Sequence, residues 1–150
     1  MKKNNRLRKK QTINATKIII ITGSIGMGKS TTVSLFKYLG YPFFDADFFA
    51  RKVIEFNTYG YKLVKENFPN VIKHNKINRR ALGEIVFSDT DSLKNLEKII
   101  NPLIAKERER FIKSHKLKRS KAIVLDIPLF FEIKEESSYP NIFVVTAPGF

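Results

Sequence analysis

The feature that most constrains the fold is an apolar, β-branched run that leads directly into a glycine-rich segment. Residues 17–22 read Lys-Ile-Ile-Ile-Ile-Thr, and residues 23–30 read Gly-Ser-Ile-Gly-Met-Gly-Lys-Ser. A continuous apolar run of this length is typical of a strand that is buried on both faces, which indicates a parallel sheet between layers of helices. We therefore expect an α/β fold with three layers, helix, parallel sheet and helix.

The glycine-rich segment has the spacing of a phosphate-binding loop, a glycine followed after four residues by Gly-Lys-Ser. Backbone N–H groups of such a loop can face phosphate oxygens, and the following helix adds the positive end of its dipole. We expect Lys29 to reach the β and γ phosphates of ATP and the Ser30 hydroxyl to bind Mg²⁺, which prefers hard oxygen ligands. The alternative is a tight glycine turn that binds no ligand, but such a turn would not require a Lys-Ser pair at its end. The predicted ATP-binding residues are Gly23, Ser24, Ile25, Gly26, Met27, Gly28, Lys29, Ser30 and Thr31.

Length and composition narrow the class of protein. A chain of 150 residues is long enough for one domain with its own core, and the lack of cysteine excludes disulfides and thiolate metal sites. No apolar run approaches the roughly 18 to 20 residues of a membrane span. We expect a cytoplasmic protein that makes no contact with a membrane.

The formal net charge of +14 is unevenly distributed. Residues 1–17 contain basic residues and no acid, and residues 106–121 form a second basic segment. Such segments can bind nucleic acid by neutralising phosphates, but a disordered basic tail over residues 1–16 and a solvated helix face are an alternative explanation. We favour the second interpretation and expect nucleic acid not to be a partner.

The rest of the chain alternates between helical and strand patterns. Short strands are predicted at 42–44, 122–125 and 142–145, and the last should lie at an open edge of the sheet. Helices are predicted from the loop to Gly40, over 48–68 with an interruption at 57–60, from an Asn78 cap to Phe87, and beyond a cap at Asp89 or Asp91. Pro102 should kink or restart that last helix, and residues 71–77 are expected to form a turn or short loop.

Three carboxylates follow predicted strands and should meet beside the phosphate loop. Asp45 and Asp47 follow the strand at 42–44, and Asp126 follows the strand at 122–125. In an open parallel sheet, ligands bind at the carboxyl ends of the strands. Phosphoryl transfer needs one carboxylate to orient and deprotonate the attacking hydroxyl and one to hold the Mg²⁺ shell. Any one of the three could instead cap a helix.

Four sequence blocks together resemble the dephospho-coenzyme A kinase family. They are TGSIGMGKST, the Asp45-Ala46-Asp47 step with Ala50-Arg51, the Ile77–Leu82 segment followed by Val86-Phe87, and the run from Asp126 to Glu132. A phosphate loop alone fits many functions, whereas the order and spacing of these blocks from Ile18 to Pro148 are similar to one family. The resemblance implies the P-loop NTPase fold with a helical substrate-binding insertion at about 48–117, inside a kinase domain covering 17–150.

The resemblance also implies an activity and site residues. Members transfer the γ-phosphate of ATP to the ribose 3′-hydroxyl of dephospho-coenzyme A, which yields coenzyme A. By this resemblance Asp47 is the catalytic base and Lys29 the catalytic lysine, while Ser30 and Asp126 hold the metal. The expected contacts of the substrate are Thr22, Asp45, Arg79 and Glu132.

Two departures from the family pattern bear on the activity. Asn101-Pro102 replaces a His-Pro step, and the family continues beyond this point with a glutamine and paired arginines on a lid. We expect a shortened member with low kinase activity, because lid arginines stabilise the transferring phosphoryl group. Two other functions stay open from the sequence: another phosphate-loop kinase acting on a nucleoside or sugar alcohol, and a nucleotide- or nucleic-acid-binding module without catalysis.

Overall fold

The computed structural model describes residues 15–23, 28–128 and 136–146. The strands are β1 (Lys17–Thr22), β2 (Phe43–Asp45), β3 (Ile72–Lys73), β4 (Lys76–Ile77), β5 (Ala122–Asp126) and β6 (Ile142–Val144). The helices are α1 (Lys29–Tyr38), α2 (Ala46–Lys52), α3 (Tyr59–Asn67), α4 (Arg79–Ser88) and α5 (Thr90–Leu117), with 3-10 turns η1 (Pro69–Val71) and η3 (Glu136–Ser138).

The main sheet has four strands in the order β2-β5-β1-β6. Every pairing in it is parallel, with Ile19 opposite Val124 and Asp45 opposite Asp126. The predicted parallel sheet is therefore confirmed. The prediction for the last strand is also confirmed, because β6 lies at an edge of the sheet that the described residues form.

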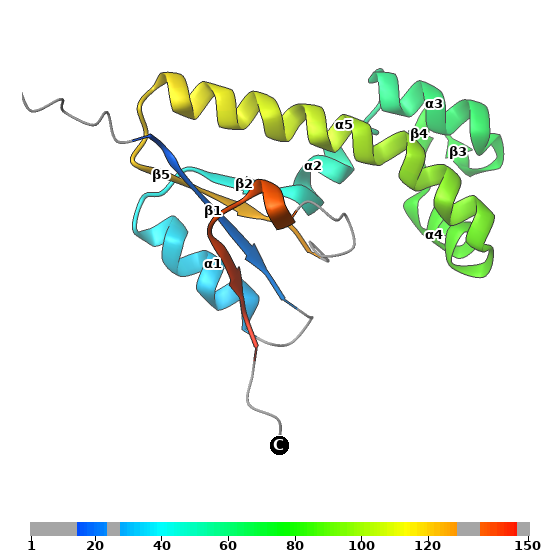
Figure 1. Cartoon of the computed structure of the whole chain (residues 1–150). Coiled ribbons are helices and arrows are strands. Elements are labelled where there is room, and N and C mark those ends of the chain that lie inside the picture. The colour runs from blue at the N-terminus through cyan, green and yellow to red at the C-terminus, as the bar shows by residue number, and fades with distance from the viewer. Residues whose placement is uncertain (1–14, 24–27, 129–135, 147–150) are drawn as a thin grey trace, which may run out of the picture.

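Side chains of β1 alternate between two hydrophobic cores, which explains its continuous apolar sequence. Ile20 packs with Phe44, Ile123 and Leu125 on the face that α5 covers. Ile21 packs with Val33 of α1 on the opposite face. Figure 1 shows α1 below this sheet and α5 running across its other side. The expected order of layers, helix, sheet and helix, is thus confirmed.

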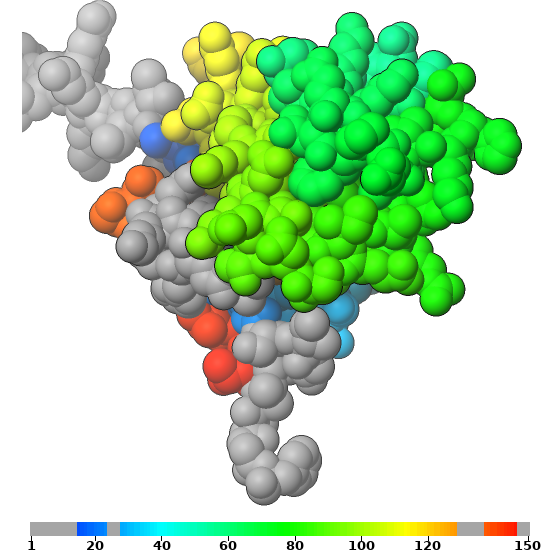
Figure 2. Space-filling view, turned by 90° about the vertical axis from the view of Figure 1, so that its right-hand side faces the viewer, coloured from blue at the N-terminus to red at the C-terminus, as the bar shows by residue number. Residues whose placement is uncertain are grey.

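A separate hydrophobic cluster holds the helical region together. Figure 1 shows α3 and α4 gathered at one end of α5, away from the sheet, and the green helices form one continuous block in the space-filling view of Figure 2. The buried residues of this cluster are Ile54, Val64, Phe68, Val71, Leu82, Val86 and Ile99. The helical region therefore has its own core.

Capping side chains set where the helices of this region begin. Asn78 accepts a hydrogen bond from the Ala81 N–H, as predicted, and Asp89, the first of the two expected candidates, accepts one from the Ser92 N–H. A cap of this kind satisfies a backbone donor that has no partner within its own helix.

Two sequence predictions need correction. Residues 72–77 form a β-hairpin rather than a loop; its turn residues His74 and Asn75 have positive φ of 48° and 59°, which the lack of a glycine concealed. α2 begins at Ala46 rather than at Phe48, because Asp45 caps it. Of the two outcomes predicted for Pro102, a kink or a restart, the restart is excluded, because α5 runs through Pro102 without interruption.

The described part of the chain contains no helix that is both long and apolar enough to cross a membrane.

Candidate active site

The carboxyl ends of β1, β2 and β5 lie side by side and bring the predicted site residues together. Thr22 ends β1, Asp45 ends β2 and Asp126 ends β5. Since the strands are parallel neighbours, their carboxyl ends lie at the same edge of the sheet (Figure 1). The site therefore occupies the edge where ligands of open α/β sheets bind.

The phosphate loop begins and ends with glycines that no other residue could replace without strain. Gly23 has a φ of 151°, and a Cβ there would lie 2.5 Å from the carbonyl oxygen of Val145. Gly28 has a φ of 85° and directly precedes α1. Its carbonyl oxygen accepts hydrogen bonds from the N–H groups of Thr31 and Thr32. The predicted residues Ser24, Ile25, Gly26 and Met27 lie outside the described residues.

A long-range ion pair joins the phosphate loop to β5. The Lys29 Nζ lies 2.7 Å from the Asp126 Oδ1, and the two side chains are only 19% and 13% exposed. Burial raises the pKa of the Asp126 carboxyl; Lys29 acts in the opposite direction, and the charges of Asp45 and Asp47 add to the increase. Lys29 and the three carboxylates therefore share one electrostatic environment, as the sequence predicted.

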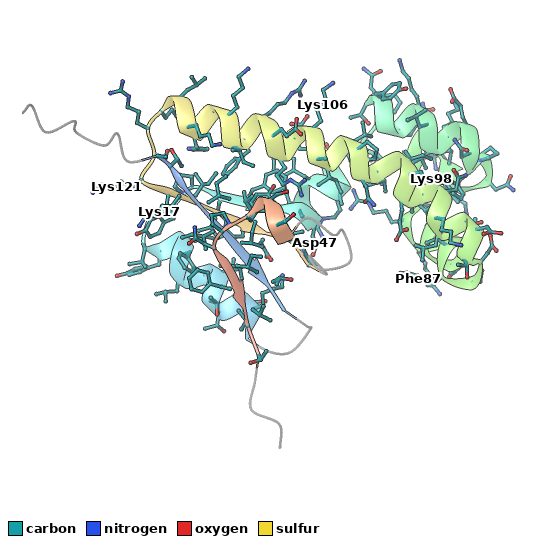
Figure 3. The ribbon with its side chains drawn as sticks, in the orientation of Figure 1. Lys17, Asp47, Phe87, Lys98, Lys106 and Lys121 are labelled. Carbon is teal, nitrogen blue, oxygen red and sulfur yellow. The ribbon has the colours of Figure 1, made fainter. Side chains whose placement is uncertain are left out.

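Asp45 and Asp47 occupy different positions at the start of α2. The Asp45 Oδ1 accepts a hydrogen bond of 2.8 Å from the Phe48 N–H and so caps the helix, which was the alternative role considered for these residues. Asp47 lies in the first turn and is exposed. Figure 3 labels it beside the carboxyl ends of the strands. Asp47 is therefore the more exposed carboxylate of this pair.

The remaining predicted residues of the loop edge have contrasting exposure. Thr22 is buried, and its carbonyl oxygen accepts a hydrogen bond from the Val145 N–H. Ser30 and Thr31 are exposed in the first turn of α1. Among the residues that the structure describes, no group of three or more His, Cys, Asp or Glu side chains could hold a metal ion.

Arg79 lies in the helical region and contacts α2. It is the first residue of α4, and its Nη2 donates a hydrogen bond of 3.3 Å to the carbonyl oxygen of Arg51. It lines a cavity of about 370 Å³ together with Glu55, Phe56 and Lys76. Sequence reasoning missed these three lining residues. The available signal was their position in the sequence: Glu55 and Phe56 follow the block from Asp45 to Arg51, and Lys76 precedes Arg79.

A comparison of the whole sequence with known families identifies the one to which this site belongs. The model of the family described as "CoaE: Dephospho-CoA kinase" matches residues 17–149. The chain belongs to the dephospho-CoA kinase family. The resemblance noted in the sequence is thereby confirmed.

Individual relatives agree with this assignment. A dephospho-CoA kinase of Bartonella quintana (strain Toulouse) is 40% identical over 132 residues, which cover 88% of this chain and 67% of the relative. One from Oryza sativa subsp. japonica is 40% identical over 131 residues, covering 85% and 57%. The chain thus spans about two thirds of the length of the bacterial relative and less of the plant one.

Solved structures show the same fold. The crystal structure of TT1252 from Thermus thermophilus superposes with a TM-score of 0.73 at 35% identity and covers 89% of this chain and 67% of that one. Dephospho-CoA kinase from Campylobacter jejuni superposes with a TM-score of 0.69 at 27% identity, with the same coverage. The P-loop NTPase fold expected for this chain is confirmed.

Two remaining sequence predictions, one on a site residue and one on the basic helix face, have a different outcome. Glu132 lies outside the described residues, so its predicted contact with the substrate remains a prediction. Arg108, which sequence analysis placed on a solvated basic helix face, is only 8% exposed in α5. Its neighbours one helical turn away, Ile104 and Ile112, pack into the core of the sheet. That apolar spacing was the signal that could have separated Arg108 from the exposed basic residues.

Proposed function

We propose that this chain transfers the γ-phosphoryl group of ATP to the ribose 3′-hydroxyl of dephospho-coenzyme A. The observation that supports this most strongly is the family match over residues 17–149, together with a phosphate loop whose lysine is paired with an acid at the edge of the sheet. Family membership gives the reaction class. The geometry suggests how the residues of this chain divide the work.

Lys29 and the loop residues bind the nucleotide phosphates in this proposal. The loop glycines allow backbone N–H groups to approach phosphate oxygens, and the start of α1 adds its positive dipole end. Lys29 leaves Asp126 to contact the β and γ phosphates. The negative phosphates compete with the Asp126 carboxylate for Lys29. This competition favours the phosphates, because burial disfavours the charged form of Asp126. Gly23 to Thr31 supply the ATP contacts.

The oxygen donors present fit Mg²⁺. Ser30 offers a hydroxyl in the first turn of α1, and Asp126 has a second carboxylate oxygen besides the one that Lys29 contacts. Mg²⁺ commonly binds one or two protein oxygens and completes its shell with phosphates and water, which agrees with the lack of a three-acid group among the described residues. When bound, the ion would neutralise charge on the β and γ phosphates.

Asp47 acts as the general base. As the 3′-hydroxyl oxygen bonds to the γ-phosphorus and the bond from that phosphorus to ADP breaks, the hydroxyl proton passes to the Asp47 carboxylate. Asp47 suits this role because its side chain is exposed. Asp45 is less suited, because its Oδ1 accepts the hydrogen bond that caps α2. Asp126 is less suited to it, because in this proposal its carboxylate holds the metal.

The helical region from about 48 to 117 binds the acceptor. Its contribution includes Arg79, whose guanidinium can pair with phosphate oxygens of the acceptor and whose hydrogen bond to Arg51 ties it to the helix that carries Asp47. The adjoining cavity of about 370 Å³ has the size of a small-molecule site. Thr22, Asp45 and Glu132 are the other proposed contacts of the substrate.

The test measures phosphorylated product formed by the 150-residue chain. ATP and dephospho-coenzyme A are incubated with the protein, and phosphorus NMR locates the new phosphate. We expect a monoester at the ribose 3′ position and about a 100-fold or larger loss of rate in Asp47→Asn. Asp91→Asn is the matched control, because Asp91 also lies exposed in the first turn of a helix. Equal rates for the two variants, or phosphorylation of adenosine in preference to dephospho-coenzyme A, would contradict the proposal.

A further inference from the structure

A second cavity lies between helices of the helical region and shares no lining residue with the cavity at Arg79. It has a volume of about 400 Å³ and is formed by the last turn of α2, the start of α3 and the middle of α5. Figure 3 labels Lys106, one of its lining residues, on the side of α5 that faces away from the sheet, whereas Asp47 lies beside the ends of the strands. None of the predicted site residues lines it.

Backbone packing gives this cavity a fixed floor. Gly60 is buried, and a Cβ there would lie 2.2 Å from the Val53 carbonyl oxygen and 2.8 Å from the Leu103 Cδ1. The Thr58 hydroxyl donates to the same Val53 oxygen at 2.8 Å, and its oxygen accepts from the Tyr61 N–H. The start of α3 is therefore held directly against the end of α2 and against α5. These backbone contacts, and not only the conformations of long side chains, set the shape of the cavity.

Positive charge surrounds the opening of the cavity. Lys52, Lys106 and Arg110 line it, with Glu107 as the acid among its lining residues. Lys106 and Arg110 are four residues apart and so lie on the same side of α5. The Arg110 Nη1 lies 2.7 Å from the Glu107 Oε1, which orients the guanidinium and leaves other N–H donors for a ligand. The lining carries a surplus of positive charge and several donors, which suits an anion.

Apolar and aromatic side chains form the rest of the lining. Phe49 stacks on Phe44 with ring centroids 4.4 Å apart, so this wall is anchored to the core of the sheet. Tyr59 is 67% exposed and offers a free ring surface, and Leu103 and Val53 complete the apolar part. Pockets that combine apolar walls with a few charged donors are typical of small-molecule sites.

We propose that this cavity is a second ligand site, which binds a small phosphate ester carrying a planar ring. Lys106, Arg110 and Lys52 bind the phosphate oxygens by charge-assisted hydrogen bonds, and the ring packs between Tyr59 and the apolar wall at Leu103. The volume of about 400 Å³ lies within the roughly 300 to 1,000 Å³ of ligand pockets. The site is separate from the proposed kinase reaction and does not depend on it.

The test follows binding of phenyl phosphate by changes in the backbone amide NMR signals of the 150-residue chain. We expect the largest changes at Tyr59, Gly60 and Leu103, and binding at least tenfold weaker in the double variant K106Q/R110Q. Lys98→Gln is the matched control, since Lys98 is another exposed lysine of α5 outside the cavity (Figure 3). It should bind phenyl phosphate like the unaltered chain.

Two further probes separate the parts of the ligand. Inorganic phosphate lacks the ring and phenol lacks the charge, and each should bind at least tenfold more weakly than phenyl phosphate at the cavity amides. Signal changes confined to residues 28–32 would mean that the probe binds only the phosphate loop and would overturn the proposal. Unchanged binding in K106Q/R110Q, or equal affinity for inorganic phosphate, would overturn it as well. None of these results depends on kinase activity.

Discussion

The sheet and the helical region place their charges in opposite ways. At the edge of the sheet, Lys29 of α1 and Asp126 of β5 are 97 residues apart in sequence and form a pair whose side chains are 19% and 13% exposed. In the helical region, Arg80 and Glu84 are four residues apart and form a pair whose side chains are 90% and 67% exposed. Strand order creates the first pair, and helical periodicity creates the second.

This difference separates functional charge from solvated charge. Taking charges out of water costs free energy, so a shielded ion pair is favourable only where its geometry compensates for that cost. Such a pair therefore marks a candidate functional site. Exposed pairs one helical turn apart arise readily and contribute only about 0.3–0.5 kcal/mol. The number of basic residues in this chain is therefore a poor guide to its site, whereas the position of one lysine at the end of a parallel sheet is a good one.

The largest expected effect concerns the core on which the sheet edge depends. Phe44 is fully buried between β5 and α5, whereas Phe87 of α4 is 86% exposed. We expect Phe44→Ala to lower the free energy of unfolding by about 3–5 kcal/mol through lost burial and a residual cavity. Phe87→Ala should change it by less than about 0.5 kcal/mol. Urea unfolding of both variants checks this, and similar losses would contradict the burial described.

Two glycines of the helical region test how tightly its helices meet. Gly60→Ala places a methyl group against the Val53 carbonyl oxygen and Leu103, and should cost about 1–3 kcal/mol of stability through overpacking. At Gly83 a Cβ would meet only the ring of Phe87 at 3.7 Å. Gly83→Ala should therefore stabilise α4 by up to about 1 kcal/mol. Thermal unfolding measures both, and a neutral Gly60→Ala would show that α3 can move away from α2.

Double-mutant cycles compare the two ion pairs directly. For Arg80 and Glu84, both exposed, we expect a coupling energy of about 0.3–0.5 kcal/mol that decreases in high salt. For Lys29 and Asp126, hydrogen-bonded and shielded, we expect more than about 1.5 kcal/mol with a weaker salt dependence. Unfolding of the single variants Lys29→Met and Asp126→Asn and of their combination measures the second. Equal couplings would remove the distinction between the two regions.

The smallest expected effect is a pH dependence at the end of α5. Burial lowers the pKa of His115 from its ordinary 6.5, and the charge of Lys118 adds to this. Between the lowered value and 6.5 the unfolded chain binds the proton more readily, so the contribution to stability is complete above 6.5 and is lost as the pH falls through this window. The free energy of unfolding of the unaltered chain, minus that of His115→Gln, should decrease as the pH falls through this window. An increase of this difference at lower pH would contradict the prediction.

The sequence predicted the sheet edge better than the helical region. Continuous apolar strands and the loop spacing were sufficient to place Lys29 near Asp45, Asp47 and Asp126, because parallel strands leave little freedom at their carboxyl ends. The hairpin at 72–77 was missed because Asn75 adopts a positive φ that is usual for glycine. The burial of Arg108 and the contact of Arg79 with Arg51 depend on how helices pack, which local patterns do not fix.

The most direct test of the account is transfer of radiolabel from γ-labelled ATP to dephospho-coenzyme A by the 150-residue chain, by Lys29→Met and by Lys37→Met. Lys37 is the matched control, because it lies in the same helix and its side-chain Nζ lies over the ring of Phe43 rather than beside a carboxylate of the site. We expect labelled coenzyme A from the unaltered chain, about a 100-fold or larger loss of rate in Lys29→Met, and an unchanged rate in Lys37→Met. No labelled product from the unaltered chain, or the same rate in all three proteins, would contradict the account.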